Sequence, residues 1–333
     1  MTQPLRFGVL GAAKIARNHL IPAIAKAEGA AFWGVASRSL KTAEAFVGEV
    51  GGGRGVEGYE ALLNNPDVDV IYNPLPNDLH VPMSIKALEA GKHVLCEKPL
   101  ALSVEDAQRL QQVARQHSGL KVMEAFMYRF HPQWQQVLDW IGAGSIGEIR
   151  SISSNFCYCN HDPANIRNKP EAGGGALMDI GCYGISATRM LMGVEPKAVV
   201  ASADMHAEFG VDNMMHLLMT FEDKASATVV VSTKSQRSQG LSVEGTKGRI
   251  VVTHPFYCDE HDERVIRLET NETDQELIFG GDIDHYQLMI EAFVHSIRED
   301  NPVPLSLDDS IANMKVIDAA FTSVSRAGWV DVV

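Results

Sequence analysis

The feature that most constrains the fold is a regular alternation of short apolar runs with helical patterns through the first 125 residues. Apolar runs cover Leu5–Leu10, Ala31–Ala36 and Val68–Asn73, and a segment with helical spacing follows each of them. Strands that alternate with helices pair in parallel and place helices on both faces of the sheet. We therefore predict a doubly wound α/β domain of the Rossmann type over residues 1–125.

The first predicted strand runs directly into a glycine-rich turn and a helix. The turn reads Gly11-Ala12-Ala13-Lys14-Ile15-Ala16, which is the Gly-x-Ala-x-x-Ala variant of the dinucleotide-binding fingerprint. Gly11 permits the tight turn, Ala13 lets a pyrophosphate approach the backbone, and the helix start offers free N–H groups to phosphates. An ordinary strand-to-helix turn is the alternative, and this motif alone does not decide between the two.

The second strand ends in a sequence that bears on the choice of dinucleotide. NAD-preferring sites usually carry Asp or Glu here, but this chain has Ser37-Arg38-Ser39. A hydroxyl and a guanidinium suit a 2′-phosphate, because arginine binds phosphate as a two-pronged donor. We predict NADP as the cofactor, with NAD as the alternative if Arg38 only stacks on the adenine.

A buried strand near residue 95 ends at two charged residues. Val94, Leu95 and Cys96 are apolar, and Glu97-Lys98-Pro99 follows them. Open α/β sheets bind ligands at the C-terminal ends of their strands, and Pro99 restricts the backbone of Lys98. A lone lysine there would be most simply a solvated strand end, but the neighbouring motifs favour a functional lysine.

From Ile146 the pattern changes to consecutive strands, which predicts a second domain over residues 126–333. We expect α+β architecture with a large, mainly antiparallel open sheet. Helices are expected at Ile283–Glu299 and Asp308–Ala327, and the C-terminal helix is able to pack back on the first domain. The predicted strands are Glu148–Tyr158, Ala198–Met205, Met215–Phe221, Ser226–Thr233, Leu241–Glu244, Gly248–Val252, Val265–Leu268 and Gln275–Ile278.

One segment interrupts the strand pattern of this second domain. Three glycines, Gly173–Gly175, precede a helix that runs to about Met192. Asp179 and Tyr183 are four residues apart and so share one face of that helix. An acid and a phenol on one face can exchange protons with a substrate. A surface aspartate beside a core tyrosine is the alternative.

Composition excludes several classes of protein. The net charge of −13, from 29 basic and 42 acidic residues, argues against nucleic acid as a partner. No apolar run approaches the length of a membrane span, and no signal peptide is recognisable. Five cysteines without framework spacing indicate a reducing compartment, so we expect a cytoplasmic protein. Neither Cys157 and Cys159 nor the run from His254 to Asp262 has metal-ligand spacing, so no metal site is predicted.

Together these residues resemble the glucose–fructose oxidoreductase, inositol dehydrogenase and rhizopine-catabolism (Gfo/Idh/MocA) family over essentially the whole chain. The segment Glu124–Pro132 and the ending at Tyr183 are most similar to the branch that holds D-xylose dehydrogenase and dimeric dihydrodiol dehydrogenase. A tyrosine where the inositol dehydrogenase branch has histidine counts against an inositol substrate. The motifs that carry the resemblance are the Gly11 fingerprint, Pro74–His80, Glu97-Lys98-Pro99, Glu124–Pro132 and Gly173–Tyr183.

The resemblance implies a role for each matching residue. Lys98 would contact the reacting oxygen, Tyr183 would exchange the proton and Asp179 would orient the substrate, with a cis peptide at Lys98-Pro99 as an option. A nearby ammonium lowers the pKa of a phenol, so Lys98 can assist Tyr183. The expected cofactor contacts are Gly11, Ala13, Lys14, Ile15, Ser37, Arg38, Pro74, Leu75, Asn77, His80, Glu97 and Lys98. The expected substrate contacts are Phe126, Arg129, His131, Arg167, Asp179 and Tyr183.

We therefore predict an NAD(P)-dependent oxidoreductase that transfers a hydride between nicotinamide and a carbon of a sugar, polyol or vicinal diol. The family also implies a homodimer or homotetramer formed through the open sheet face. Two alternatives remain: a non-catalytic regulator that senses the dinucleotide, and a sugar–sugar oxidoreductase with tightly bound cofactor. The presence of Lys98, Asp179 and Tyr183 together favours an enzyme over a sensor.

Overall fold

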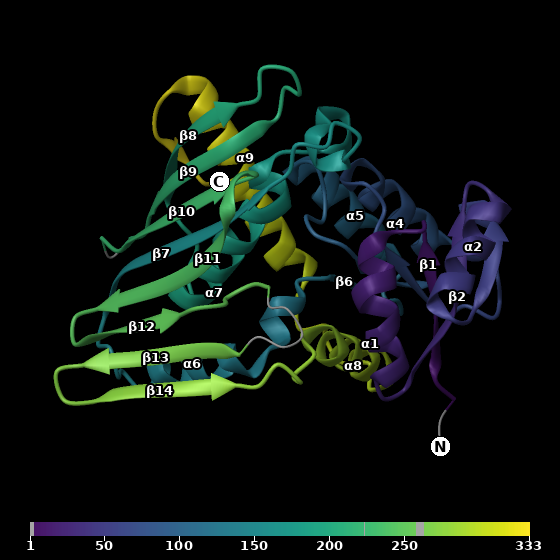
Figure 1. Ribbon diagram of the computed structural model, residues 1–333, viewed down its shortest axis with the longest axis horizontal. Coiled ribbons are helices and arrows are strands. Elements are labelled where there is room, and N and C mark those ends of the chain that lie inside the picture. The colour runs from purple at the N-terminus through teal and green to yellow at the C-terminus, as the bar shows by residue number, and fades with distance from the viewer. Residues whose placement is uncertain (1–2, 223, 258–262) are drawn as a thin grey trace. The chain divides into compact units, whose positions relative to one another are not determined.

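The computed structural model describes residues 3–222, 224–257 and 263–333, and the chain divides into two compact units. The first unit runs to Phe130 and takes back Asp284–Ile311, and the second comprises His131–Ile283 and Ala312–Val333. The first unit therefore extends slightly beyond the predicted boundary at residue 125 and includes a segment from much later in the sequence. Each unit is built around one sheet (Figure 1).

The first unit contains a six-stranded sheet in the order β3-β2-β1-β4-β5-β6. All of its neighbouring strands are parallel. This is the doubly wound order of dinucleotide-binding domains, in which ligands bind at the C-terminal ends of the strands. The predicted Rossmann fold is confirmed. The strands are β1 (Leu5–Leu10), β2 (Ala30–Ser37), β3 (Arg54–Glu57), β4 (Val70–Asn73), β5 (His93–Cys96) and β6 (Val122–Glu124).

The central strands of this sheet are apolar because helices cover both of its faces. Every residue of β4 and β6 is buried. The helices of this unit are α1 (Ile21–Lys26), α2 (Leu40–Val50), α3 (Tyr59–Leu63), α4 (His80–Glu89), α5 (Val104–Gln116) and α8 (His285–Arg298). A π-helical turn, Ala16–Leu20, precedes α1.

Local signals in the sequence set several helix ends. The hydroxyl of Ser103 accepts the N–H of Asp106 at 3.2 Å and caps α5, as its near capping box predicts. Gly91 closes α4 with a φ of 75°. Asn77–Leu79 forms a short 3₁₀ turn, and α4 begins directly after it with no side-chain cap.

The second unit contains a nine-stranded sheet in the order β14-β13-β12-β11-β7-β10-β9-β8-β15. Its pairs are antiparallel except β7 with β10, which is parallel. The predicted mainly antiparallel sheet is confirmed, although β11 is much longer than expected and β15 was not predicted. The strands are β7 (Ile149–Cys159), β8 (Ala198–Met205), β9 (Asp212–Thr220), β10 (Ser226–Ser232), β11 (Lys234–Gly245), β12 (Gly248–Val252), β13 (Arg264–Thr270), β14 (Asp274–Phe279) and β15 (Val330–Asp331).

Residues along this sheet alternate between a buried and a more open face. In β9, Met215, Leu217 and Met219 are buried, whereas His216 is exposed between them. Figure 1 shows helices behind the strands of this sheet, among them α7 (Cys182–Met192) and α6 (Pro132–Gly142), the latter not predicted from sequence. The long helix α9 (Leu307–Arg326) starts in the first unit and continues into the second. No helix within the described ranges is long and apolar enough to cross a membrane.

Candidate active site

The turn after β1 requires glycine. Gly11 has a φ of 82°, and its N–H donates to the carbonyl of Ala36 at 2.7 Å. A Cβ atom at this position would lie only 2.9 Å from a methyl group of Leu75, so a side chain here would be both strained and crowded. Ala13, Lys14 and Ile15 follow directly and lead into the π-helical turn. The backbone therefore has the form that the dinucleotide fingerprint predicts.

Two residues at the end of β2 differ in exposure. Ser37 is buried, whereas Arg38 is exposed to solvent. The Arg38 side chain forms no ion pair or hydrogen bond with any residue that the structure describes. Its guanidinium is thus available to an anionic ligand at the C-terminal edge of the sheet.

The residues after β5 lie among buried partners. Tyr72 at the end of β4 donates its hydroxyl to the Glu97 carboxylate at 2.6 Å. Burial and the Glu97 charge raise the pKa of Tyr72 well above its usual value, so this phenol stays protonated and serves as a donor. Lys98 is half-buried, and the Lys98-Pro99 peptide is cis, as the family resemblance allows. Tyr72 thus holds the carboxylate of Glu97 directly after β5, next to Lys98 in the sequence.

His80 connects the two loops that follow β4 and β5. Its Nδ1 lies 2.7 Å from the carbonyl oxygen of Pro99, and its Nε2 lies 2.7 Å from that of Leu75. The ring is 1% exposed, and burial lowers its pKa to about 4 despite the two carbonyl contacts. Each ring nitrogen lies beside a backbone carbonyl, and the neutral ring donates its single N–H to one of the two. The ring thus lies between the two loops, and its contact with the cofactor stays a prediction.

A second buried group supports the Lys98 loop from β6. The Glu124 carboxylate accepts the N–H of Leu100 at 2.8 Å and also hydrogen-bonds the Ser310 hydroxyl. Glu124 is 2% exposed, and burial, strengthened by the charge of Asp309, raises its pKa to about 7. The backbone just after the cis peptide is therefore attached to a carboxyl group that titrates near neutrality.

In the second unit, the glycine-rich segment meets a buried aspartate. Gly175 has a φ of 113°, and a Cβ there would lie 2.0 Å from Oδ1 of Asp212. The other oxygen of Asp212 accepts the N–H of Leu177 at 2.7 Å. Burial raises the pKa of Asp212 to about 7, while backbone N–H donors oppose that rise. Asp212 thus accepts a backbone N–H at the start of the helical segment that carries Asp179 and Tyr183.

That segment is not a uniform α-helix. Leu177–Gly181 forms a π-helical turn, and α7 continues from Cys182. Gly184 lets the helix lie close to the sheet, since a Cβ there would come within 2.7 Å of Val229 in β10. At Gly181 a Cβ would lie 2.7 Å from Leu177 of the same helical segment and 3.4 Å from Val231 of the sheet. Single π-helical turns inside helices occur frequently at functional sites. Tyr183 lies between these two close approaches.

The side chains of Asp179 and Tyr183 have distinct surroundings. Oδ2 of Asp179 accepts the Tyr158 hydroxyl at 2.6 Å and the Arg167 Nε–H at 2.8 Å. The Tyr183 ring packs edge-on against Phe156 at 5.8 Å between centroids and is tilted against Phe256 at 5.6 Å. The charge of Asp179 raises the pKa of Arg167 well above its usual value, with a smaller contribution from Tyr183. One guanidinium therefore interacts electrostatically with both the carboxylate and the phenol.

Three of the predicted substrate contacts have other partners in the structure. The Arg129 guanidinium pairs with Asp309 at 3.2 Å. His131 is 1% exposed, and its Nδ1 accepts the Gln133 N–H at 3.2 Å, which caps α6. Phe126 is 1% exposed and packs edge-on against Tyr128. Each of these residues has a clear structural use, and their contact with substrate stays a prediction.

Sequence reasoning missed several residues of this region. Tyr158, Phe156 and Phe256 surround Asp179 and Tyr183, and Asp212 fixes the start of their helix. Tyr158 is the last residue of the predicted strand Glu148–Tyr158, and no motif marks it. For Asp212 and Phe256 no local motif marks the position, since their partners lie 35 or more residues away in sequence.

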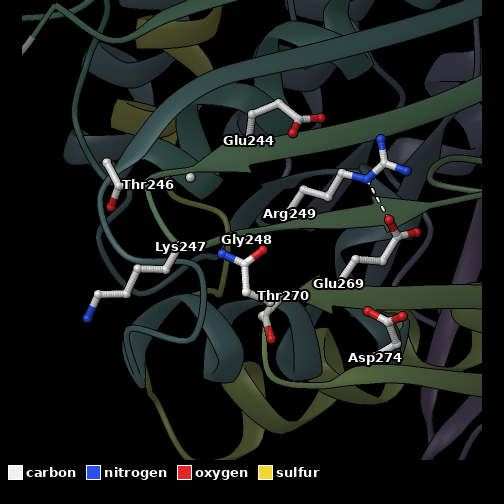
Figure 2. Close-up of a pocket in the computed structure, with 10 residues that line it drawn as sticks. Glu244, Thr246, Lys247, Gly248, Arg249, Glu269, Thr270 and Asp274 are labelled. Carbon is white, nitrogen blue, oxygen red and sulfur yellow. Dashed lines mark hydrogen bonds and ion pairs between the residues drawn. The ribbon is translucent and has the colours of Figure 1, made fainter.

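A polar hollow elsewhere in the second unit contains none of the predicted site residues. Figure 2 shows it at the turns of the β11–β12 and β13–β14 hairpins, where Arg249 pairs with Glu269. Among the residues that the structure describes, no three histidine, cysteine or acidic side chains gather as a metal site requires. Of the run from His254 to Asp262, residues 258–262 lie outside the described part of the chain. The candidate site residues thus form two sets, one at the strand ends of the first unit and one on the Asp179–Tyr183 segment of the second unit.

Comparison with known proteins identifies the family of the chain. Residues 5–126 match the model of an oxidoreductase family with an NAD-binding Rossmann fold, and residues 134–251 match the GFO/IDH/MocA C-terminal domain. An uncharacterized oxidoreductase of Rhizobium meliloti is 39% identical over 98% of each chain. The NADP-dependent D-xylose 1-dehydrogenase 2 of Haloferax volcanii is 33% identical over 98% of this chain and 99% of its own.

A solved structure gives the same result. The 3-ketoreductase KijD10 from Actinomadura kijaniata, in complex with NADP and TDP-benzene, superposes with a TM-score of 0.90 at 33% identity, over 96% of this chain and 98% of that chain. The family resemblance seen in the sequence is confirmed, including the branch that contains D-xylose dehydrogenase. The chain therefore belongs to the GFO/IDH/MocA family and is an NAD(P)-dependent oxidoreductase.

Proposed function

We propose that this oxidoreductase transfers a hydride between NADP(H) and a hydroxyl-bearing or carbonyl carbon of a sugar, polyol or vicinal diol. The single observation that carries the proposal is the Asp179–Tyr183 segment, where a phenol enclosed by two aromatic rings lies within the electrostatic reach of Arg167, which binds the Asp179 carboxylate. Such a group can supply the proton that must accompany hydride transfer at a carbinol carbon.

Three residues have distinct roles in this proposal. Lys98, held between Glu97 and the cis-proline, contacts the reacting oxygen, and Tyr183 donates or accepts its proton. Asp179 accepts a hydroxyl of the substrate and sets its orientation. The nicotinamide supplies the redox chemistry when bound, while the protein supplies position and charge. KijD10, a 33% identical relative, has also been solved as variants in which one lysine or one tyrosine is replaced.

The choice of NADP rests on Arg38. Its exposed guanidinium follows β2, where a 2′-phosphate would lie, and no acidic residue stands beside it to bind a free ribose hydroxyl. Relatives named for NADP, the Haloferax dehydrogenase and KijD10, support the same preference. The other proposed dinucleotide contacts are Gly11, Ala13, Lys14, Ile15, Ser37, Pro74, Leu75, Asn77, Glu97 and Lys98, with His80 acting through the Leu75 and Pro99 backbone.

The test is a fluorescence titration of the purified protein with NADPH and with NADH, followed by a panel of aldoses, ketoses, osones and diols. We expect tighter NADPH binding and turnover with at least one member of the panel. Tight binding without turnover across the panel would contradict the catalytic proposal and favour a dinucleotide sensor. Failure to bind either dinucleotide would contradict the proposed cofactor site.

We further propose that the open face of the nine-stranded sheet forms a homodimer, or a homotetramer built from dimers. Half-buried apolar side chains from three adjacent strands, Val200, Leu218 and Val230, lie among short polar ones on this face. Leu218→Glu should convert the assembly to monomers in light scattering, whereas Val194→Glu, at a residue already 55% exposed, should not. An unchanged mass in both variants would place the interface elsewhere.

A cytoplasmic location is the final part of the proposal. The described cysteines, Cys96, Cys157, Cys159 and Cys182, are all free thiols, as a reducing compartment favours. Fractionation of cells that express the native protein tests this, and recovery in an extracytoplasmic fraction would contradict it.

A further inference from the structure

We propose that Tyr158 is a positioning residue, which together with Arg167 holds the Asp179 carboxylate in the orientation that the proposed oxidoreductase reaction uses. This inference rests on the proposed function, because Asp179 is assigned there to the substrate.

The geometry places two donors on one carboxylate oxygen. The Tyr158 hydroxyl lies 2.6 Å from Oδ2 of Asp179, and the Arg167 Nε lies 2.8 Å from the same atom. The three residues come from separate elements, namely β7, the 3₁₀ turn Ile166–Asn168 and the π-helical turn Leu177–Gly181. Two donors from different directions fix the plane of a carboxylate better than one, since each restricts a different rotation.

Burial makes this arrangement necessary. The Asp179 side chain is only 10% exposed, whereas the Arg167 side chain is 44% exposed. A buried carboxylate without strong donors is costly, so losing either partner is expected to turn the carboxylate or to favour its protonated form. An aspartate in either state would be a poorer acceptor for a substrate hydroxyl.

The same arrangement sets the electrostatic environment of Tyr183. Arg167 interacts with both Asp179 and Tyr183, and the Asp179 charge keeps its guanidinium ionised. Tyr158 fixes the position in which the carboxylate pairs with the Arg167 guanidinium. It thereby also sets the strength of the electrostatic interaction between that guanidinium and the phenol of Tyr183. The rings of Phe156 and Phe256 hold the phenol itself in place.

A purely structural role for Tyr158 predicts a different outcome. In that case the hydroxyl would only fasten the end of β7 to the helix, and its removal would lower stability whatever residue stands at 179. A role through Asp179 instead predicts that the loss of the hydroxyl matters only while the carboxylate is present. A double-mutant cycle separates the two cases.

The experiment compares wild type, Tyr158→Phe, Asp179→Asn and the double variant by kcat, KM and Kd for NADPH. Tyr158→Phe should lower kcat/KM by about tenfold, as expected for a hydrogen bond to a charged group, with the NADPH Kd unchanged. In the Asp179→Asn background the same change should cost less than about twofold, because the interaction that it removes is already lost. Tyr257→Phe, which keeps its ring over Arg237, is the matched control and should leave kcat/KM unchanged.

Independent, multiplying losses from Tyr158→Phe and Asp179→Asn would overturn the proposal, as would an unchanged rate in Tyr158→Phe. Arg167→Lys keeps the charge but lacks the Nε–H donor, so it should shift the alkaline limb of the kcat profile less than Arg167→Gln does. Equal shifts in both would show that Arg167 does not act through its charge.

A readout without turnover separates failure of this inference from failure of the proposed function. If the wild type turns over no sugar or diol, the function fails, but the Arg167 Nε–H resonance in nuclear magnetic resonance still reports the contact with Asp179. Tyr158→Phe should move that resonance and Tyr257→Phe should not. An identical resonance in wild type and Tyr158→Phe would refute the positioning role on its own.

Discussion

In the first unit the proposed reactive group, Lys98, follows a buried parallel strand, whereas in the second unit Asp179 and Tyr183 stand on a helical segment that begins just after Gly175. The strand end is fixed by Pro99 and by His80, which joins two loops through their carbonyl groups. The helix is fixed by close packing of glycines against the sheet. The residue after the strand is therefore positioned by restraints on its loop, whereas the residues on the helix are positioned by the packing of the helix face against the sheet.

The two regions share one device. In each region a buried carboxyl group accepts a backbone N–H close in sequence to the proposed reactive residue. Glu124 accepts the N–H of Leu100, and Asp212 accepts the N–H of Leu177. Burial raises the pKa of each to about 7. Substitutions of the reactive group, of the helix packing and of the two carboxyl groups, made in turn, test whether the two regions are stabilised in the same way.

The largest effect should come from Lys98→Ala. Loss of the ammonium removes both a contact to the reacting oxygen and a charge that favours phenolate, so kcat should fall by roughly 10²–10⁴. NADPH affinity should stay within a few-fold of wild type. Lys41→Ala, at an exposed residue of α2, is the control. Full activity in Lys98→Ala would contradict a catalytic role for the residue that follows β5.

The packing of the helix is tested by Gly175→Ala. Its Cβ would meet the Asp212 carboxylate at 2.0 Å in a backbone with positive φ, so the free energy of unfolding should fall by about 3 kcal/mol. Gly193→Ala has positive φ but no neighbour within 4 Å, and it should cost about 1 kcal/mol. Denaturant titration measures both. Equal losses would mean that close contact with Asp212 does not constrain the helix start.

A smaller effect is expected in the pH dependence of stability. Because the folded-state pKa of Glu124 is raised from 4.5 to about 7, the folded protein binds more protons than the unfolded chain in that window, and stability falls as pH rises through it. Glu124→Gln removes this titration. The free energy of unfolding of the variant, taken relative to wild type, should therefore be higher at pH 8 than at pH 5 by on the order of 2 kcal/mol.

Asp212→Asn should behave in the same direction between pH 4 and 7, because the pKa of Asp212 is also raised, from 3.8 to about 7. Unfolding in urea at several pH values gives the free energies for both variants. If one variant follows the wild-type pH profile and the other does not, the two carboxyl groups do not serve the two regions alike.

The smallest effect should come from Arg38→Ala, which touches only the cofactor. NADPH affinity should fall by about tenfold, as expected for loss of a charged phosphate contact, while NADH affinity should change little. Fluorescence titration of both dinucleotides gives the ratio. Equal losses would show that Arg38 does not distinguish the 2′-phosphate, and would leave strand β2 without a part in cofactor choice.

The first region was largely predictable and the second was not, for a physical reason. Parallel strands and the Gly11 turn are local signals, and the rule that ligands meet strand ends then places Lys98 without further information. The partners of Asp179 come from residues 12 to 21 positions earlier, and Asp212 lies 35 residues beyond Leu177. Only the folded sheet brings such residues together, so no spacing rule could name Tyr158.

The sequence also predicted α-helical spacing for Asp179 and Tyr183, whereas the segment contains a π-helical turn. Such a turn inserts one residue into the helix and depends on packing against the sheet, which periodicity does not report. The predicted substrate residues Arg129 and His131 illustrate the same limit, since their partners, Asp309 and the cap of α6, are set by tertiary contacts or by an unpredicted helix.

The return of α8 to the first unit has a consequence for the order of events during synthesis. Tyr286 of α8 stacks on His19, and Arg298 donates to the carbonyl oxygens of Gln3 and Gly29. A nascent chain of 130 residues therefore lacks a helix that its own dinucleotide unit requires, although domains commonly fold from the N-terminus as they emerge. The ribosome must synthesise β7 to β14, all strands of the second sheet except β15, before the first unit can close. This chain is therefore expected to acquire dinucleotide binding only near the end of translation.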